Sequence, residues 1–375
     1  MERSVKCNIG IQQIVIDKNQ PAYRQAGSLF SSYLRYPMIR LSAIFILSFI
    51  SLSLIAQPSV NQKDASGKKQ GKWEKKDVNE KKIYEGTFKD NKPVGEFKYY
   101  YDTGEIKTIS IFSENGSVCR TKHYFPGNIL MAEGKYINEK RDSIWKFYNA
   151  PNALVSEEGY KNGKKNGFEK TYNQVGVLTE EKNWKDSVLH GAWFQYYDDS
   201  SMKVAGNYNK GLLEGEIKYY FPGKILSATG NYLHSLKHGK WLYYGKNGTL
   251  ITGKENYTQG YLDGYYSEYY EKDGVQKISG QYKKGKENGK WIHRDENGKI
   301  IKEVNYVFGS LHGTYAEFSP NGNKKIVANY YYDRKADKYI ELDEEGKIVK
   351  EESFDSVDVL KKKVAEEQKL KNKKK

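Results

Sequence analysis

Residues 280–287, with the sequence GQYKKGKE, have the glycine and lysine spacing of a nucleotide phosphate-binding loop. Such a loop needs Ser or Thr after the lysine to bind magnesium, with a strand before it and a helix after it. Glu287 occupies the Ser/Thr position, and the glycines coincide with turn positions that recur along the chain. We therefore interpret this segment as a turn of a repeated unit and not as a nucleotide site.

The histidines and paired carboxylates also lack a catalytic or metal-binding pattern. His190, His238 and His312 each precede a recurring position of the repeat, which favours a role in turns. His234 and His238 are four residues apart on a turn instead of on one helix face, so they lack the geometry of a zinc site. Neighbouring carboxylates such as those at positions 180–181 point to opposite faces of a strand. The sequence predicts no enzyme activity, no cofactor and no metal site.

The composition of the 375-residue chain is unusual for a protein with a thick aliphatic core. It has 33 Tyr against 14 Phe and 6 Trp, 35 Gly, and a mean hydropathy of -0.83. Tyrosine buries a large ring while its hydroxyl stays in contact with water, which suits a thin, half-exposed layer. An aromatic content of 14% argues against simple disorder.

The net charge of +15 is concentrated at the ends of the chain. The last fifteen residues hold eight lysines against two glutamates, and the first 56 hold six basic residues against two acidic ones. A nucleic-acid-binding module would show a basic face on its folded part, and none is visible, so no nucleic-acid partner is predicted. We expect the lysine tail to be a solvated, disordered end.

A secretory signal is predicted at residues 38–56. Met38 and Arg40 precede an uncharged apolar run of about 16 residues, which is shorter than the roughly 20 residues of a membrane span. Small residues end the run, and cleavage is expected after Ala56, which would make the protein periplasmic, cell-surface or secreted. An uncleaved amino-terminal anchor is the alternative. Residues 1–37 are interpreted as a non-physiological or disordered leader, with Met38 as the true start, and residues 57–70 as a linker.

Cysteine usage agrees with export. Removal of the signal takes Cys7 with it, so the mature chain would keep Cys119 alone and form no internal disulfide.

One unit of about 24 residues is repeated twelve times without a gap. Its first position, which we call the phase position, is usually glycine and is occupied in turn by Gly71, Gly95, Cys119, Ser143, Gly167, Gly191, Gly215, Gly239, Gly264, Gly289, Gly313 and, weakly, Lys338. Such a fixed period is typical of solenoids and other repeat arrays.

Each unit has the pattern of a β-hairpin. In most copies an aromatic residue follows the phase position by five, a turn such as DTG, KNG or ENG comes next, and a second aromatic lies about seventeen residues after the phase position. Short runs of aromatic and β-branched residues separated by Asn-Gly or Asp-Gly indicate paired strands.

The predicted fold is therefore all-β, an elongated, twisted antiparallel β-meander solenoid over residues 71–352. One hairpin is marginal alone, so each must pair with its neighbours. Val357, Leu360 and Val364 then predict a short helix after Asp355, within residues 353–375, that covers the last strand.

The pattern G-x-W-x-x-Y-Y, then NG, then G-x-Y-x-x-G-x-x-x-G, resembles the MORN repeat, specifically its bacterial variant. The resemblance covers residues 71–346 and implies an elongated meander of stacked hairpins. It also implies a scaffold or interaction surface, sometimes at membranes, and bacterial variants are often described as antitoxin components. The chain departs from the family where W-x-x-Y-Y replaces Y-x-G, and where Ser143, Cys119 and Lys338 replace the phase glycine.

The sequence favours an exported, non-enzymatic protein whose aromatic rows bind a protein or an envelope component, polysaccharide and lipid included. The alternatives are a carbohydrate-binding or adhesion ribbon of the envelope and an antitoxin-like protein-binding module. The rows either form the core of the ribbon or line a binding face, with Tyr196, Tyr220, Tyr244 and Tyr269 as the candidates. The predicted structural turn glycines are Gly191, Gly215, Gly239, Gly264, Gly289 and Gly313. The oligomeric state stays open.

Overall fold

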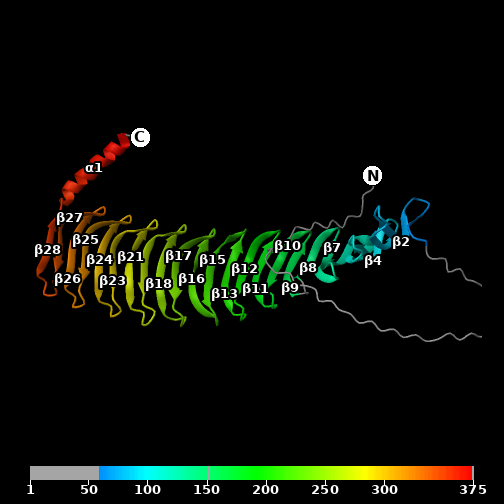
Figure 1. Ribbon diagram of the computed structural model, residues 1–375, viewed down its shortest axis with the longest axis horizontal. Coiled ribbons are helices and arrows are strands. Elements are labelled where there is room, and N and C mark those ends of the chain that lie inside the picture. The colour runs from blue at the N-terminus through cyan, green and yellow to red at the C-terminus, as the bar shows by residue number, and fades with distance from the viewer. Residues whose placement is uncertain (1–58, 150–152, 374–375) are drawn as a thin grey trace, which may run out of the picture.

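The computed structural model describes residues 59–149 and 153–373, and the predicted signal, its cleavage site and the leader lie outside them. Within this part the chain forms one antiparallel sheet of 28 strands, drawn out into a long ribbon (Figure 1), followed by a single α-helix. The all-β meander predicted from the sequence is confirmed.

The strands are β1 Gln62–Lys63, β2 Lys69–Lys76, β3 Lys82–Lys89, β4 Lys92–Tyr100, β5 Ile106–Ser113, β6 Val118–Phe125, β7 Ile129–Ile137, β8 Lys140–Asn149, β9 Ala153–Lys161, β10 Lys164–Tyr172, β11 Leu178–Lys185, β12 Val188–Tyr196, β13 Met202–Asn209 and β14 Leu212–Leu213. They continue with β15 Gly215–Phe221, β16 Ile225–Leu233, β17 Leu236–Tyr244, β18 Ile251–Thr258, β19 Tyr261–Leu262, β20 Gly264–Tyr269, β21 Gln276–Lys283, β22 Lys286–Glu287, β23 Gly289–Arg294, β24 Ile300–Val307, β25 Ser310–Phe318, β26 Lys324–Tyr331, β27 Arg334–Leu342 and β28 Ile348–Ser353. A short 3₁₀ turn, Glu114–Gly116, joins β5 to β6, and α1 spans Val357–Lys373.

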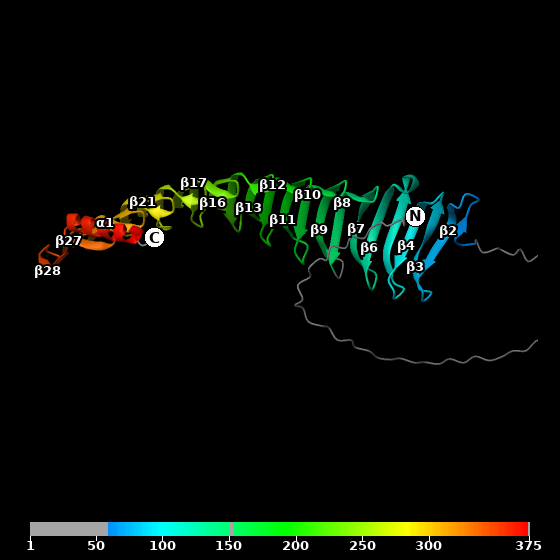
Figure 2. The same ribbon diagram turned by 90° about the horizontal axis from the view of Figure 1, so that it is seen from above.

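Strands pair with their neighbours in chain order, as in the hairpins β16–β17 and β17–β18. The two-residue strands β14, β19 and β22 are the first pieces of interrupted strands, because each pairs with the same strand as the piece that follows it. Figure 2 shows the ribbon turning slowly about its long axis, from broadside near β3 to nearly edge-on near β28. This is the twist expected of a sheet built from L-amino acids.

The two edges of the ribbon carry different turns. At one edge, which we call the tight-turn edge, two residues with positive φ join the strands, for example His234 and Ser235 with φ of 52° and 64°. This is the type I′ geometry, whose twist matches that of the strands. At the other edge, the loop edge, residues such as 101–105 form a turn closed by hydrogen bonds between Tyr101 and both Gly104 and Glu105. The DTG-like motifs lie at this loop edge.

In most units the phase position lies in a β-bulge of a strand. Gly239 has a φ of 67°, which an L side chain rarely adopts, although open space surrounds the position of its missing Cβ. Across the ladder, Thr229 pairs with Leu242 and Asn231 with His238, so residue 230 alone faces residues 239–241. The bulge therefore requires the backbone freedom of glycine and does not require its small size.

The helix α1 confirms the apolar stripe predicted from the sequence, with Leu360 buried and Val357 and Val364 half-buried. It packs against β26 and β27, and in Figure 1 it leaves the end of the ribbon and does not lie along β28. Ser356 accepts the hydrogen bond from the Val359 N–H, so Ser356 caps the helix, whereas the sequence pattern favoured Asp355. The helix extends to Lys373 and includes most of the lysine tail that we expected to be disordered.

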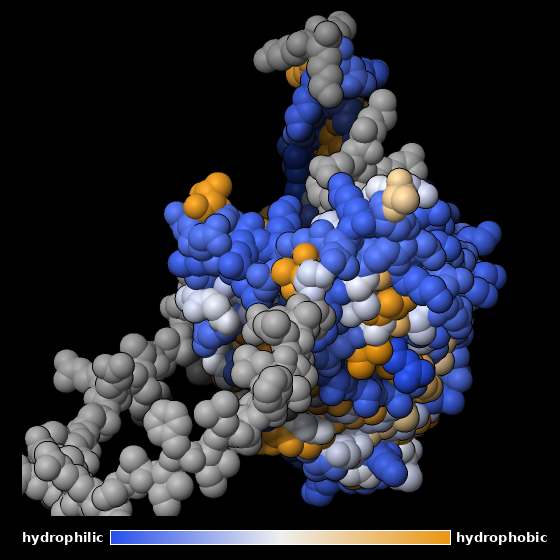
Figure 3. Space-filling view, turned by 90° about the vertical axis from the view of Figure 1, so that its right-hand side faces the viewer, coloured by the Kyte–Doolittle hydropathy of each residue, from blue (hydrophilic) through white to orange (hydrophobic). Residues whose placement is uncertain are grey.

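Seen from its amino-terminal end, the ribbon is mostly hydrophilic, with small and scattered apolar groups (Figure 3). Within residues 59–149 and 153–373, no helix has the length and apolar character needed to cross a membrane.

Candidate binding surface

The two faces of the sheet carry different rows of aromatic side chains. The tryptophan face, named for Trp145, Trp241 and Trp291, holds the buried core of the ribbon. Cross-strand partners lie on one face and neighbours in a strand on opposite faces. Tyr243 stacks on Trp241 and so lies on the tryptophan face. The next residue, Tyr244, is the tyrosine five residues after the phase position, and it therefore points to the opposite face.

The core of the ribbon is a stack of rings resting on glycines. Trp241 is 1% exposed and contacts the rings of Tyr232 and Tyr257 at centroid separations of 5.4 and 6.3 Å. Its indole lies directly over Gly230 of the preceding strand, where a Cβ would fall 2.2 Å from the ring. The Trp241 Nε1–H donates to the Asn231 carbonyl at 3.2 Å. The bulge thus brings an indole over a glycine and lets the indole N–H bond a neighbouring carbonyl.

The same arrangement recurs in other hairpins. The ring-on-glycine pairs are Phe97 on Gly86, Trp145 on Gly134, Trp241 on Gly230 and Trp291 on Gly280. In all four pairs the glycine precedes the ring by eleven residues. This spacing is present in the sequence, but the patterns that predict strands and turns do not depend on it. These glycines are the residues that sequence reasoning missed.

The four candidate tyrosines Tyr196, Tyr220, Tyr244 and Tyr269 lie half-buried on the opposite face, close to the loop edge, in four consecutive hairpins. Among the described residues, no ring contact joins them to the tryptophan stack. The sequence left open whether the aromatic rows form the core or a surface, and the structure places one row in each.

The hydroxyls of this tyrosine row have different partners along the ribbon. In the amino-terminal part, Tyr100 donates to Glu85 at 2.6 Å and Tyr148 donates to Glu133 at 2.8 Å. Burial, together with the bonded carboxylate, raises the pKa of both phenols to about 12. Within the part of the chain that the structure describes, the hydroxyls of Tyr196, Tyr220 and Tyr244 have no hydrogen-bond partner.

The sequence explains this difference for Tyr220 and Tyr244 but not for Tyr196, which has Glu181 fifteen residues before it and no hydrogen bond to it among the described residues. The acceptor glutamate lies fifteen residues before the tyrosine, and Ala205 and Thr229 occupy that position for Tyr220 and Tyr244. For Tyr269 the position is Lys254, whose ammonium lies 5.0 Å from the ring centroid. Burial favours a high pKa for Tyr269, but the Ser267 hydroxyl and Lys254 outweigh burial and lower it. The rings of the tyrosine row are therefore regularly placed, while the hydroxyls of Tyr196, Tyr220 and Tyr244 have no hydrogen-bond partner among the described residues.

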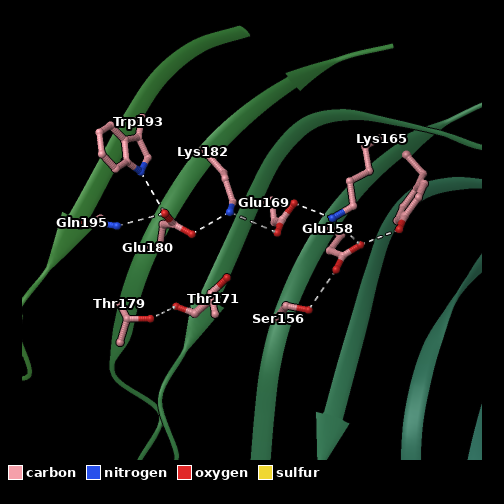
Figure 4. Close-up of polar contacts among 11 residues, drawn as sticks. Ser156, Glu158, Lys165, Glu169, Thr171, Thr179, Glu180, Lys182, Trp193 and Gln195 are labelled. Carbon is pink, nitrogen blue, oxygen red and sulfur yellow. Dashed lines mark hydrogen bonds and ion pairs between the residues drawn. The ribbon is translucent and has the colours of Figure 1, made fainter. Parts of the chain in front are cut away.

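A charged cluster interrupts the ring stack on the tryptophan face (Figure 4). Lys165 bonds Glu169 at 2.6 Å and Glu158 at 3.2 Å, while Lys182 bonds Glu180 at 2.7 Å. Glu158 stands at the repeat position of Gly134, and Glu169 at that of Trp145. Burial raises the pKa of Glu180, but bonds from Lys182, Trp193 and Gln195 outweigh it and keep the pKa below its usual value.

Because each carboxylate of this cluster has a cationic partner, we assign the cluster a structural role. Among the described residues, no group of three or more His, Cys, Asp or Glu side chains is placed to hold a metal ion.

A groove of about 610 Å³ lies on the opposite face nearer the amino-terminal end. Its floor includes Ile109, Ile111 and Ile144, of which Ile111 and Ile144 are about half exposed. Arg120 and Lys122 stand at its rim, where Lys122 pairs with Glu133.

The six predicted turn glycines lie in strands and not in the two-residue turns. Gly191, Gly239 and Gly313 lie inside β12, β17 and β25, while Gly215, Gly264 and Gly289 begin β15, β20 and β23. All six have positive φ, between 67° and 105°. Their repeat positions also place His190, His238 and His312 in strands.

The MORN repeat variant family matches the chain at residues 93–114 and 287–307, and each match spans one hairpin, β4–β5 and β23–β24. No curated protein sequence is significantly similar to the chain.

Among solved structures, a chain of the crystal structure of TcdB2-TccC3-TEV is similar over 72% of this chain, at 12% identity and a TM-score of 0.17. The match spans only 17% of that chain's length. Because the hairpin unit recurs in register from Gly71 to Lys338, the two family matches mark copies of one array, and the chain carries repeats of the MORN variant type.

Proposed function

We propose that this protein is a non-enzymatic, exported repeat protein that binds a protein or another envelope component along the face opposite its tryptophan core. The observation that carries the proposal is the row Tyr196, Tyr220 and Tyr244, whose rings are regularly spaced and whose hydroxyls lack partners among the described residues. The core does not use these rings, and a half-buried ring with a free hydroxyl can both pack and hydrogen-bond a ligand.

The spacing of the row suits an extended ligand. Successive hairpins are two strands apart, roughly 9.6 Å, so three rings span roughly 19 Å. Neighbouring strands hold the rings in place, so little ordering entropy is lost on binding. The apolar groove around Ile111 and Ile144 extends the same face toward the amino-terminal end.

Replacement of Tyr196, Tyr220 and Tyr244 together by Ser should abolish capture of the envelope partner, since it removes the rings without touching the buried stack. The test is a quantitative pull-down from envelope extract, with circular dichroism confirming an unchanged fold. Conversion of the same tyrosines to Phe should weaken capture less, because only the hydroxyls are lost. Unchanged capture by the Ser variant would refute the assignment, and binding to a glycan array would favour the carbohydrate alternative.

Export is tested separately by cell fractionation and by the amino-terminal peptide of the mature protein. Cleavage after Ala56 should place the protein outside the cytosol. A cytosolic protein would support the antitoxin-like alternative, and a mature peptide from residues 1–37 would contradict the assignment of Met38 as the start.

A further inference from the structure

A row of exposed apolar side chains follows the tight-turn edge on the face opposite the tryptophans. It consists of Val188, Leu212, Leu236 and Tyr261, each the first residue after a two-residue turn in four consecutive hairpins. Their exposed fractions are 44%, 42%, 48% and 63%. We call these four residues the edge row.

The fold does not require apolar residues at these positions. The other hairpins with a two-residue turn carry polar or charged residues there, namely Lys92, Lys140, Lys164, Lys286, Ser310 and Arg334. The stem of Lys140 covers Gly163 of the next turn, much as Leu236 covers Gly260. A lysine therefore serves the packing of the edge equally well, and the four apolar residues need another explanation.

A groove of about 530 Å³ lies within the edge row. It is formed where two neighbouring hairpins meet, and its lining includes Leu233, Leu236 and Tyr261, with His234 and His238 beside them. Leu233 is the cross-strand partner of Leu236 and is 38% exposed, so it widens the apolar surface at this point.

The hydrogen bonds of this edge favour a helical occupant. The turn N–H groups already bond to the preceding hairpin, as Ser235 does to the Leu213 carbonyl at 2.9 Å and Gly260 to the Lys237 carbonyl at 3.0 Å. An added β-strand would find no free ladder along the row, whereas a helix satisfies its own backbone.

The spacing of the edge row also favours a helix over a strand as the occupant. Row members are roughly 9.6 Å apart, which corresponds to roughly six to seven residues of an α-helix but not to a whole number of two-residue steps in a strand. The whole row, roughly 29 Å long, matches a helix of about 19 residues.

The chain itself already holds a helix against this edge. Arg334, at the repeat position of the edge row, forms a two-pronged ion pair with Glu367 of α1, with N–O distances of 2.9 to 3.1 Å. The same helix packs against β26 and β27, and its Leu360 is buried. The tight-turn edge therefore binds a helix at its carboxyl-terminal end. The edge row occupies the equivalent repeat positions with apolar side chains in place of Arg334.

We propose that the edge row docks an acidic amphipathic helix of a partner protein, aligned along the ribbon with an apolar side chain about every seven residues. Lys164 and Lys286 bound the row at either end, and Lys185 and Lys210 flank it without an ion pair among the described residues. These cations favour acidic flanks on the occupant. Helix α1 of a second copy suits the row poorly, because Lys361, Lys362 and Lys363 would meet like charges.

The test uses the full chain and a fluorescein-labelled 21-residue peptide of three heptads, with leucines on one face and glutamates on its flanks. Wild-type protein should bind this peptide in fluorescence anisotropy, and L212K/L236K should bind it at least tenfold more weakly. Since lysine is native at this repeat position, the double variant should keep the wild-type circular dichroism and thermal midpoint. K140A, at the same repeat position outside the row, is the matched control and should bind as wild type does.

A gain-of-affinity variant sharpens the test. K286L extends the row by one hairpin and should tighten binding of a four-heptad peptide while leaving the three-heptad peptide unchanged. The proposal is overturned if wild type does not bind the peptide, if L212K/L236K binds it equally well, or if a peptide with the same leucines spread around the helix binds equally. Self-association of wild type that is lost in L212K/L236K would assign the row to a second copy and would also overturn the proposal.

Discussion

At the scale of single residues, the glycines beneath the rings matter as much as the rings. Because Gly230 has no side chain, the indole of Trp241 can lie flat against the backbone there. The indole is thereby buried although the sheet has only one layer. Gly206 occupies the same repeat position under Ile217, but a Cβ there would meet its neighbours at 3.3 Å, a contact that a small shift relieves. The same substitution at the two sites should therefore have different costs.

Gly230→Ala should lower the free energy of unfolding by about 1–3 kcal/mol, because the new methyl group overlaps the indole and forces it off the sheet. Gly206→Ala should cost less than half as much. Urea unfolding followed by circular dichroism measures both variants. Equal losses at the two sites would mean that ring-on-glycine contact does not decide the cost.

His123 is a buried residue whose titration is linked to folding. Its ring is 8% exposed, bonds the Thr108 hydroxyl at 3.0 Å and stacks on Trp145 at 6.0 Å. Burial, helped by the nearby Arg141 and Lys107 charges, lowers the pKa of His123 to about 4. The folded protein therefore holds this ring neutral at a pH where the unfolded chain protonates it.

Between about pH 6.5 and pH 4 the unfolded state binds the extra proton, so His123 makes the free energy of unfolding fall as the pH falls. The loss should approach about 3 kcal/mol at the acid end of this window and be absent above it. His123→Phe introduces the residue type found at the equivalent position of the next unit, Phe147. This variant should remove the fall in the free energy of unfolding between about pH 6.5 and pH 4. Parallel pH profiles of the wild type and the variant would rule out this linkage.

At the scale of elements, most hairpins join a regular turn to a regular bulge, the exception being β5–β6. The type I′ turn sets the register at one edge, and its second residue bonds the preceding hairpin, as Ser187 does to the Lys165 carbonyl at 2.8 Å. The bulge at the phase glycine then tilts the strand so that its ring covers the neighbouring glycine. Since each of these contacts crosses to the adjacent unit, the hairpin is stable only as a member of the array.

At the scale of the whole molecule, the core of the described residues includes two apolar clusters in its amino-terminal and middle parts. One runs from Phe88 to Trp145, and the other is built on Val204, Ile217 and Trp241. The charged cluster around Lys165 and Lys182 separates them, and partly buried ion pairs stabilise less than buried rings because the charges lose hydration. A quasi-one-dimensional array opens most readily where its interfaces between units are weakest.

Hydrogen exchange should therefore be fastest, among the interior strands, in β10 and β11, with slower and separate rates on either side. Mass spectrometry of exchanging peptides measures this directly. The double variant Glu158→Gly with Glu169→Trp restores a ring over a glycine, with Lys165 placed as Lys237 is over Trp241, and should slow exchange in β10. A single exchange rate along the whole ribbon would show that the charged cluster does not divide the core.

The repeat and its secondary structure could be predicted from sequence because they depend on contacts within about 24 residues. Turn chemistry such as Asn247-Gly248 and the aromatic spacing marked the strands, and the observed pairing of Gly239 with Tyr257 joins two positions that the period had already singled out. The phase glycines were assigned to turns because a positive φ is typical of both turns and bulges, and only the ladder distinguishes the two.

The sequence by itself therefore determined an all-β array of hairpins, its period and its polar surface. Only the tertiary structure decided which face each aromatic row occupies, because bulges in most of the strand pairs break the simple alternation of side chains. It also decided that Tyr220 and Tyr244 lack an acceptor and that the edge row is exposed, because these properties depend on residues from neighbouring hairpins.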